Sequence, residues 1–194
     1  MSKSDTRSAI VSAASQLLRV NGYNGTGLDA VLKQAKVPKG SFYYYFPSKD
    51  DLGVAIIDHA AEELALKLDH HLGDAKRKPL RRLRAYFEAS IEAQRQSDCT
   101  RGCLFGTLGL ELASQNARLR ERVAAVFKDW EERVAACLRQ AQEAGEIPRR
   151  LVVAELASFI LNSWEGAILR TKIVKTVAPL NLFVDHLFQR VLRP

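Results

Sequence analysis

Residues 37–52, VPKGSFYYYFPSKDDL, bring together an unusual number of hydrogen-bond donors. The segment contains the ammonium of Lys39, the uncovered backbone of Gly40, the hydroxyl of Ser41 and the phenols of Tyr43, Tyr44 and Tyr45. Each phenol needs a partner once it is buried, so a core helix rarely carries three tyrosines in succession. Lysine and tyrosine side chains can instead donate to DNA phosphates, and small residues let the backbone approach base edges. The segment therefore predicts a DNA-contacting surface; an aromatic segment of the core is the alternative.

The thiol of Cys103, in the segment CTRGCLFGTLGLELA (99–113), is the second group that could do chemistry. A cysteine reacts as its thiolate, which requires partial exposure and a positive potential nearby. Cys103 has both if it begins a helix beside Arg101. The alternative is a small buried apolar residue, the usual state of a free cysteine. Cys99 is a candidate resolving thiol, and Cys137 is expected in the core.

The donors of the first segment must be positioned by a short helix with a sharp stop at each end. Pro38 suits the first turn of a helix, where its missing N–H has no partner to lose. Pro47 disfavours helical geometry at the residue before it, so the helix ends near Phe46. Ser48 is expected to cap the next helix, which has two acids in its first turn. Phe42 and Phe46 lie four residues apart and are expected to bury on one face.

Two further helices precede this one. The apolar spacing predicts a helix over residues 5–21, ended by Gly22 in a left-handed conformation. The turn NGYNGTG follows, and a second helix is expected to begin at Thr26 or Gly27. Two short helices joined by a brief turn, the second with a polar outer face, make a helix-turn-helix unit.

Residues 22–52, GYNGTGLDAVLKQAKVPKGSFYYYFPSKDDL, resemble the DNA-binding domain of TetR-type repressors. The family pattern contains G-[FY]-x-x-[ST]-[ST] followed by A-x-V-x-x-G-x-[FL]-Y-x-[YH]-F-x-[SN]-K, and Gly27 stands where a second hydroxyl residue is usual. The resemblance implies a helix-turn-helix domain over residues 1–48. It implies phosphate contacts from Thr26, Tyr43 and Lys49. It also places in the major groove Lys39, Gly40, Ser41, Tyr44 and Tyr45.

The rest of the chain, residues 49–194, shows apolar spacing with a helical period and no alternating strand pattern. It predicts an all-α protein of about nine helices, in which residues 49–194 form a ligand-binding and dimerisation domain. Helices expected over residues 151–174 and from residue 179 onwards are apolar across wide faces, which a second copy of the chain would bury. The alternative is two core helices of one protomer. The expected interface residues are Phe159, Phe183, Val184, Leu187, Phe188 and Val191. The basic run KRKPLRRLR (76–84) is expected to be a solvated face.

The segments RGCLFGTLGLELA and SWEGAILRTKI resemble TetR-type regulators that respond to acrylate, N-ethylmaleimide and other small electrophilic or α,β-unsaturated compounds. The resemblance implies that Cys103 is the reactive cysteine. It also implies that Trp164, Glu165 and Arg170 lie near a ligand cavity, where Arg170 would pair with a ligand carboxylate or with an acid of the body. Aromatic side chains that would form cavity walls, or simply core, are Tyr86, Phe105, Trp130 and Trp164.

The charge is concentrated near the start of the chain. The formal net charge is +7, and residues 1–50 hold +4 of it, from seven Lys/Arg and three acids. A basic N-terminal segment favours a polyanionic partner. No apolar run approaches the roughly 18 residues that span a bilayer, and the first residues lack the apolar core of a secretion signal, which favours the cytoplasm. Three cysteines fit a reducing compartment better than a disulfide framework.

Together these features predict a homodimeric, ligand-responsive repressor that binds a palindromic operator in double-stranded DNA and is released by a small effector. No cofactor and no metal site are expected. His70 and His71 near a helix end are a candidate metal pair, but adjacent residues on a helix diverge, which favours a solvated pair. The alternative is an all-α enzyme with Cys103 as nucleophile, but no motif supplies it with a base. No H-E-x-x-H, G-x-S-x-G or P-loop pattern occurs either. A third hypothesis, an architectural DNA-binding protein, predicts a body without a cavity.

Overall fold

The computed structural model describes residues 3–193, and every regular element in this range is helical, which confirms the predicted all-α class. Nine α-helices lie within it, with a 3₁₀ turn, η1 (Lys39–Ser41), and a π-helical segment, η2 (Leu187–Val191). The α-helices are α1 (Lys3–Asn21), α2 (Leu28–Ala35), α3 (Phe42–Tyr45), α4 (Lys49–Leu72), α5 (Pro79–Gln96), α6 (Leu104–Leu112), α7 (Ala117–Glu143), α8 (Val153–Val174) and α9 (Ala178–His186). None of these helices is both long and apolar enough to cross a membrane.

The chain divides into two compact units. One, the head unit, contains the chain up to Glu63 together with Cys103–Val126. The other, the body unit, contains Leu64–Gly102 and the chain from Phe127 onwards. Helix α6 and the start of α7 therefore belong to the same unit as the helix-turn-helix segment. The functional boundary between residues 48 and 49 stays a prediction.

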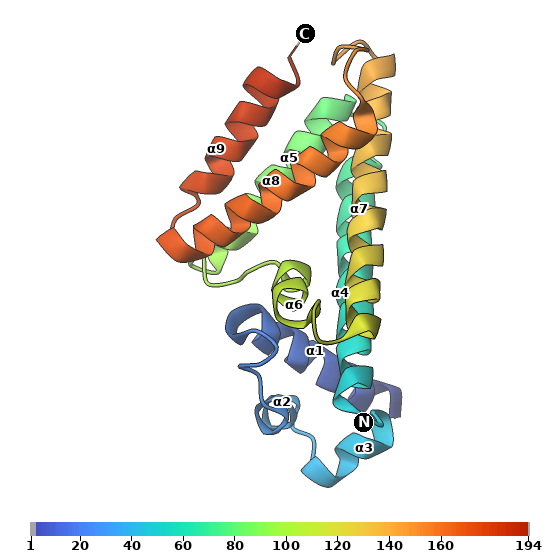
Figure 1. Cartoon of the computed structure of the whole chain (residues 1–194), viewed down its shortest axis with the longest axis vertical. Coiled ribbons are helices and arrows are strands. Elements are labelled where there is room, and N and C mark those ends of the chain that lie inside the picture. The colour runs from blue at the N-terminus through green and yellow to red at the C-terminus, as the bar shows by residue number, and fades with distance from the viewer. Residues whose placement is uncertain (1–2, 194) are drawn as a thin grey trace. The chain divides into compact units, whose positions relative to one another are not determined.

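The head unit is built around one face of α1, where Ile10, Ala14 and Leu18 recur every four residues and are buried. Helix α2 packs on this face, and α3 follows it (Figure 1). Phe42 and Phe46 are each 1 % exposed and their rings stack with centroids 5.7 Å apart, which confirms the predicted buried face of the short helix.

The ends of the short helices differ in detail from the expectation. Helix α2 begins at Leu28 with Gly27 as its N-cap. Pro38 is extended (φ −60°, ψ 142°) and precedes η1, so the predicted single helix is a 3₁₀ turn that continues into α3. Phe46 is extended, as expected before a proline. Ser48 caps α4 as predicted, because its Oγ accepts a hydrogen bond from the Asp51 N–H at 3.1 Å.

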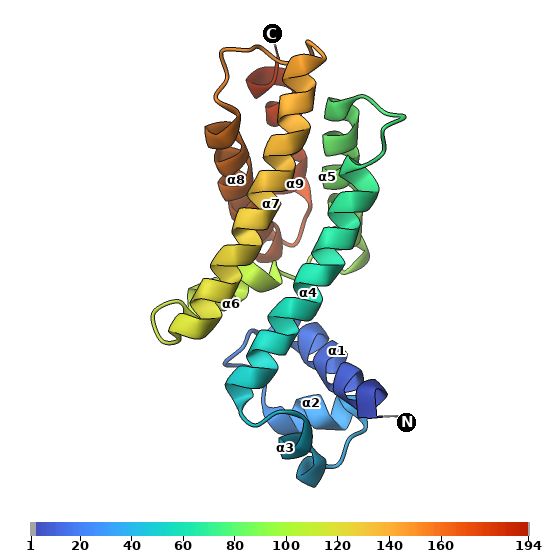
Figure 2. The same cartoon turned by 90° about the vertical axis from the view of Figure 1, so that its right-hand side faces the viewer.

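The body unit has an aromatic core shared by α5, α8 and α9. Phe87, Trp164 and Phe183 meet with ring centroids 4.7–5.4 Å apart. Figure 2 shows α8 and α9 as successive helices of this unit, joined by a short link. Packing of long apolar stripes from several helices explains why this part of the chain forms one core.

The basic run 76–84 is not uniformly solvated, contrary to the expectation. Arg82 is 8 % exposed. Its Nη1 donates a hydrogen bond to the Leu72 carbonyl and its Nη2 donates one to Gln140 Oε1, both at 2.6 Å. The run therefore contributes one structural arginine, which binds the carboxyl end of α4 to α5 and α7. Its exposed members are Lys76, Arg77, Lys78 and Arg81.

Candidate nucleic-acid interface and effector site

The short helix presents its polar side chains to solvent. Tyr43 is 69 % exposed and Tyr44 is 66 % exposed, which excludes the alternative of a core segment for these two phenols. Lys39 and Gly40 are exposed, and Ser41 and Tyr45 are half-buried. A Cβ built on Gly40 would meet no atom within 4 Å, so the backbone here is open to an approaching surface.

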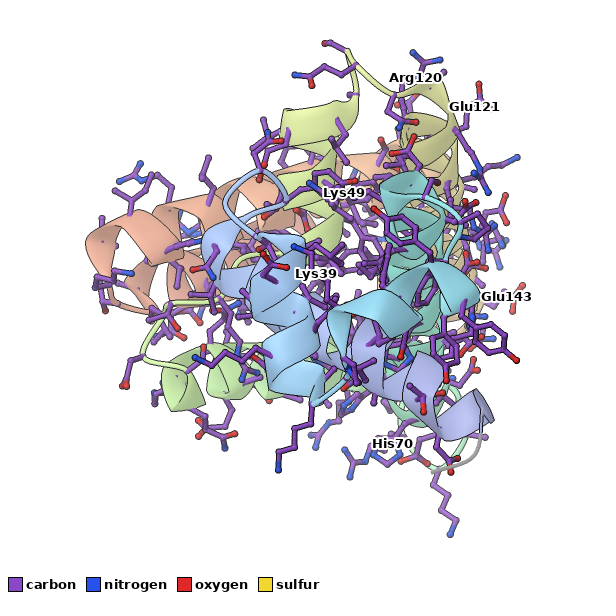
Figure 3. All side chains as sticks on the ribbon, turned by 90° about the horizontal axis from the view of Figure 1, so that it is seen from below. Lys39, Lys49, His70, Arg120, Glu121 and Glu143 are labelled. Carbon is purple, nitrogen blue, oxygen red and sulfur yellow. The ribbon has the colours of Figure 1, made fainter. Side chains whose placement is uncertain are left out.

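The two lysines of this surface, labelled in Figure 3, are held by neighbours in the head unit. Lys39 Nζ lies 2.9 Å from Asp29 Oδ1 of α2, and this hydrogen bond and the negative charge of Asp29 raise the pKa of the lysine. Lys49 Nζ lies 4.2 Å above the ring of Tyr23. Burial, with a smaller effect of Asp50, raises the pKa of the Tyr23 phenol to about 12. The raised pKa of Lys39 keeps its ammonium group charged in the physiological range.

Thr26 is placed differently from the expectation that its side chain faces phosphate. It is 5 % exposed, its Oγ1 donates to the Gly22 carbonyl at 2.6 Å, and its N–H donates to the Tyr23 carbonyl at 3.3 Å. The hydroxyl is committed to the turn between α1 and α2, and the N-cap position belongs to Gly27.

Glu111, near the end of α6, is a residue that sequence reasoning missed. Its carboxylate accepts hydrogen bonds from the backbone N–H groups of Tyr23 at 3.0 Å and of Asn24 at 2.7 Å. The adjacent Gly22 has φ +78°, and a Cβ there would lie 2.2 Å from Glu111 Oε1. One carboxylate thus binds the α1–α2 turn to α6. The glycine-rich turn indicates backbone N–H groups in need of acceptors. Their acceptor, Glu111, lies 87 or 88 residues further along the chain, so no local sequence pattern predicts the contact.

Cys103 is half-buried and is the N-cap residue of α6. Its carbonyl accepts hydrogen bonds from the N–H and the hydroxyl of Thr107 at 3.0 and 2.9 Å. The helix N-terminus carries partial positive charge, the environment in which cysteines react as thiolates. Cys137 is 3 % exposed, donates to the Pro79 carbonyl, and has its pKa raised to about 11 by burial. Cys137 is therefore a core cysteine, as predicted.

The predicted effector residues are divided between the two compact units. Tyr86, Trp130 and Trp164 are buried in the body unit, where the Tyr86 and Trp130 rings make an edge contact at 6.3 Å. Phe105 is buried in the head unit, to which Cys103 also belongs. Glu165 is half-buried.

Arg170 is exposed and lines an open groove along α8, α9 and η2, beside the residues predicted for the dimer interface rather than beside Trp130. The groove has a volume of about 600 Å³ and is mostly apolar. Phe159 is 54 % and Leu182 61 % exposed there. Val184 is 3 % exposed and packs in the core of the protomer, so its assignment to an interface surface is corrected. Leu187 is only 2 % exposed, so its assignment to an interface surface is corrected in the same way. Of the remaining predicted interface residues, Phe183 and Val191 line the groove, whereas Phe188 is half-buried and does not line it.

Within the described part of the chain, no three His, Cys, Asp or Glu side chains are grouped so that they could hold a metal ion. His70 and His71 lie with ring centroids 4.9 Å apart and edge to face.

Residues 10–56 match the family model described as bacterial regulatory proteins of the tetR family, and residues 79–187 match the tetracyclin repressor-like C-terminal domain. The chain belongs to the TetR family. It is 34 % identical over 192 residues to the HTH-type transcriptional repressor DhaR of Mycobacterium sp. strain GP1, covering 99 % of this chain and 95 % of DhaR.

Two solved structures share the fold of this TetR-family regulator. The regulatory protein TetR from Rhodobacter sphaeroides superposes with a TM-score of 0.91 at 36 % identity, over 95 % of this chain and 97 % of that one. The reduced form of NemR from E. coli superposes with a TM-score of 0.86 at 27 % identity, also over 95 % and 97 %. The relatives are transcriptional regulators, so the chain is a DNA-binding regulator rather than an enzyme.

Proposed function

We propose that this protein is a homodimeric repressor that binds a palindromic operator and releases it when a small effector binds or reacts. The exposure of Tyr43 and Tyr44 beside Lys39 and the open backbone at Gly40 is the observation that carries the proposal. Phenols and an ammonium can donate to phosphates, and the bare glycine admits base edges. Lys49 adds a charge at the start of α4.

Homodimerisation is supported by the groove along α8, α9 and η2. An apolar groove of about 600 Å³ flanked by exposed Phe159 and Leu182 is costly in water and is typical of a protein–protein contact. The same face on a second copy would fill it in a two-fold arrangement. Two recognition helices related by that axis would read half-sites roughly 34–36 Å apart.

An electrophilic effector is supported by the position of Cys103. In the reaction proposed, the thiolate forms a bond from sulfur to the β-carbon of an α,β-unsaturated compound. The carbon–carbon π bond breaks, and the α-carbon takes a proton from water. Cys103 begins α6, and Glu111 near the end of that helix holds the α1–α2 turn, so an adduct at one end would reach the DNA-binding segment through one helix.

The test is a gel-shift assay with an operator isolated from a random DNA pool. Tyr43→Ala and Lys39→Ala should each weaken operator binding by about 5- to 100-fold, whereas Lys128→Ala, at an exposed position on α7, should not. Failure to enrich any sequence, or equal binding by all variants, would refute the proposal.

The effector class is tested in the same assay by adding N-ethylmaleimide. Release is expected for the wild type and for Cys137→Ser, because the buried Cys137 thiol stays protonated. Cys103→Ser should keep its operator bound. Release of that variant would exclude a switch at this thiol.

A further inference from the structure

The link between α4 and α5 and the link between α7 and α8 lie at the same end of the body unit (Figure 2). A hydrogen bond joins them, because the Leu80 N–H donates to Glu146 Oε2 at 3.0 Å. Residues 73–82 and 143–152 contain seven Lys/Arg and three acids, a formal charge of +4. This end of the body unit therefore carries, in two short segments, the same formal charge as residues 1–50.

Five exposed cations at this end of the body unit form what we call the basic patch. They are Lys76, Lys78, Arg81, Arg149 and Arg150. None of the five pairs with an acid within residues 3–193. The neighbouring acids are mostly engaged, since Asp74 pairs with Arg77 at 3.1 Å and Glu146 accepts the Leu80 N–H. The basic patch is thus a cationic surface with little internal neutralisation.

Two further features raise the positive potential at the basic patch. Arg82, next to Arg81, is 8 % exposed, and both acceptors of its hydrogen bonds, the Leu72 carbonyl and the Gln140 amide, are uncharged. Its Nε has no hydrogen-bond partner among the described residues. A buried guanidinium without a carboxylate partner leaves its charge uncompensated. Helix α5 also begins here without an acid in its first turn, so the positive end of its dipole adds to the same field. Both features favour an anionic partner.

The composition of the two segments narrows the class of anion. Residues 73–82 and 143–152 contain no aromatic residue, so the bases of a single strand would find no ring on which to stack. Their only exposed large apolar side chain is Val152, which gives a bilayer little to bury. A compact anion at the start of α5 would compete with Glu146 for the Leu80 N–H. Several dispersed cations suit the regularly spaced phosphates of a double helix.

We propose that the basic patch binds the phosphate backbone of a second DNA duplex, separate from the one that contains the operator. A regulator bound to its operator then holds a further stretch of DNA. It does so without reading the sequence, because contacts from lysine and arginine to phosphates carry no sequence information. The inference rests on the proposed function for the operator complex and goes beyond it, since there only residues of the head unit contact DNA.

A capture assay with the full-length protein tests this proposal. The operator duplex is fixed to beads and loaded with regulator, unbound protein is washed away, and a fluorescent duplex without the operator sequence is added. The wild type should retain the fluorescent duplex. Each phosphate contact contributes roughly eightfold at 0.1 M salt, so the double variant Arg149→Gln/Arg150→Gln should bind it about 10- to 60-fold more weakly. The salt dependence of its affinity, as a log–log slope, should fall by about 2.

The matched control is Arg95→Gln/Lys128→Gln, which removes two exposed cations from the body unit, one of them at the opposite end of α5. It should capture the second duplex as the wild type does. Loading on the operator beads and circular dichroism establish that both double variants are folded. No capture by the loaded wild type, or equal capture by both double variants, would overturn the proposal.

Two further readouts distinguish the ways in which the proposal can fail. Cosedimentation with vesicles of phosphatidylglycerol and phosphatidylcholine tests an anionic membrane as the partner. Vesicle binding that is lost in Arg149→Gln/Arg150→Gln, with duplex capture unchanged, would assign the basic patch to membranes and overturn the proposal. Operator loading without capture of a second duplex refutes only the basic patch, whereas failure to load on any operator refutes the proposed function.

Discussion

The contact between Glu111 and the α1–α2 turn makes a quantitative prediction for a double-mutant cycle. Glu111→Ala removes the acceptor of two backbone N–H groups, those of Tyr23 and Asn24. Hydrogen bonds to a charged group are worth about 1.5–3 kcal/mol each when buried, and this site is partly exposed. We therefore expect the free energy of unfolding to fall by about 2–3 kcal/mol in total.

Gly22→Ala disrupts the same contact by a change in the α1–α2 turn rather than in Glu111. The new methyl group would lie 2.2 Å from Glu111 Oε1, so the carboxylate must move and lose its hydrogen bonds. The left-handed conformation at φ +78° adds about 1 kcal/mol of backbone strain. The expected loss is about 3–4 kcal/mol for this variant and nearly the same for the double variant, because the contact can be lost only once. The coupling energy is then about 2–3 kcal/mol.

Urea unfolding at one fixed protomer concentration measures the four stabilities, since dimerisation would make them depend on concentration. Gly145→Ala is the matched control: its φ is +70°, but a Cβ there meets no atom within 4 Å. It should cost about 1 kcal/mol from strain alone and should add to Glu111→Ala. The reasoning fails if Gly22→Ala and Glu111→Ala are additive to within about 0.5 kcal/mol, or if Gly22→Ala costs no more than the control.

Three further predictions concern the DNA surface, the body core and the groove. Asp29→Asn releases Lys39 from its ion pair and should tighten operator binding in gel shifts at low salt. Loss of this exposed pair accounts for a gain of at most about fivefold, and no change would mean that the pair does not compete with DNA for Lys39. Arg82→Met loses two hydrogen bonds of a buried side chain and should lower the free energy of unfolding by about 2–4 kcal/mol, as measured by urea unfolding. A decrease in the free energy of unfolding below about 0.5 kcal/mol would contradict the structural role of this arginine. Leu182→Glu places a charge in the apolar groove and should yield folded monomers in analytical ultracentrifugation. Leu66→Glu, the control at another exposed apolar position, should leave the dimer intact. Dimers of Leu182→Glu would show that the groove is not the dimer interface.

The sequence by itself determined the helical class and much of the local geometry of residues 37–52. Apolar residues at helical spacing specify α1 and α4 because one face of each must be buried. Pro47 keeps Phe46 extended, and Ser48 caps the next helix, because both effects act between neighbours in the chain. The sequence also predicted the exposure of Tyr43, because a core would have to supply a hydrogen-bond partner for each of three successive phenols.

Only the tertiary structure decided which side chains meet from distant helices. The binding of Glu111 to the α1–α2 turn and the burial of Arg82 depend on contacts between residues far apart in sequence, where no local period records the partner. The same holds for Arg170, for which the sequence left open a ligand carboxylate or an acid of the body as partner, and which lines the groove in the structure. Local sequence fixes backbone conformation through short-range sterics and hydrogen bonds, whereas charge pairing and burial are settled when the helices pack.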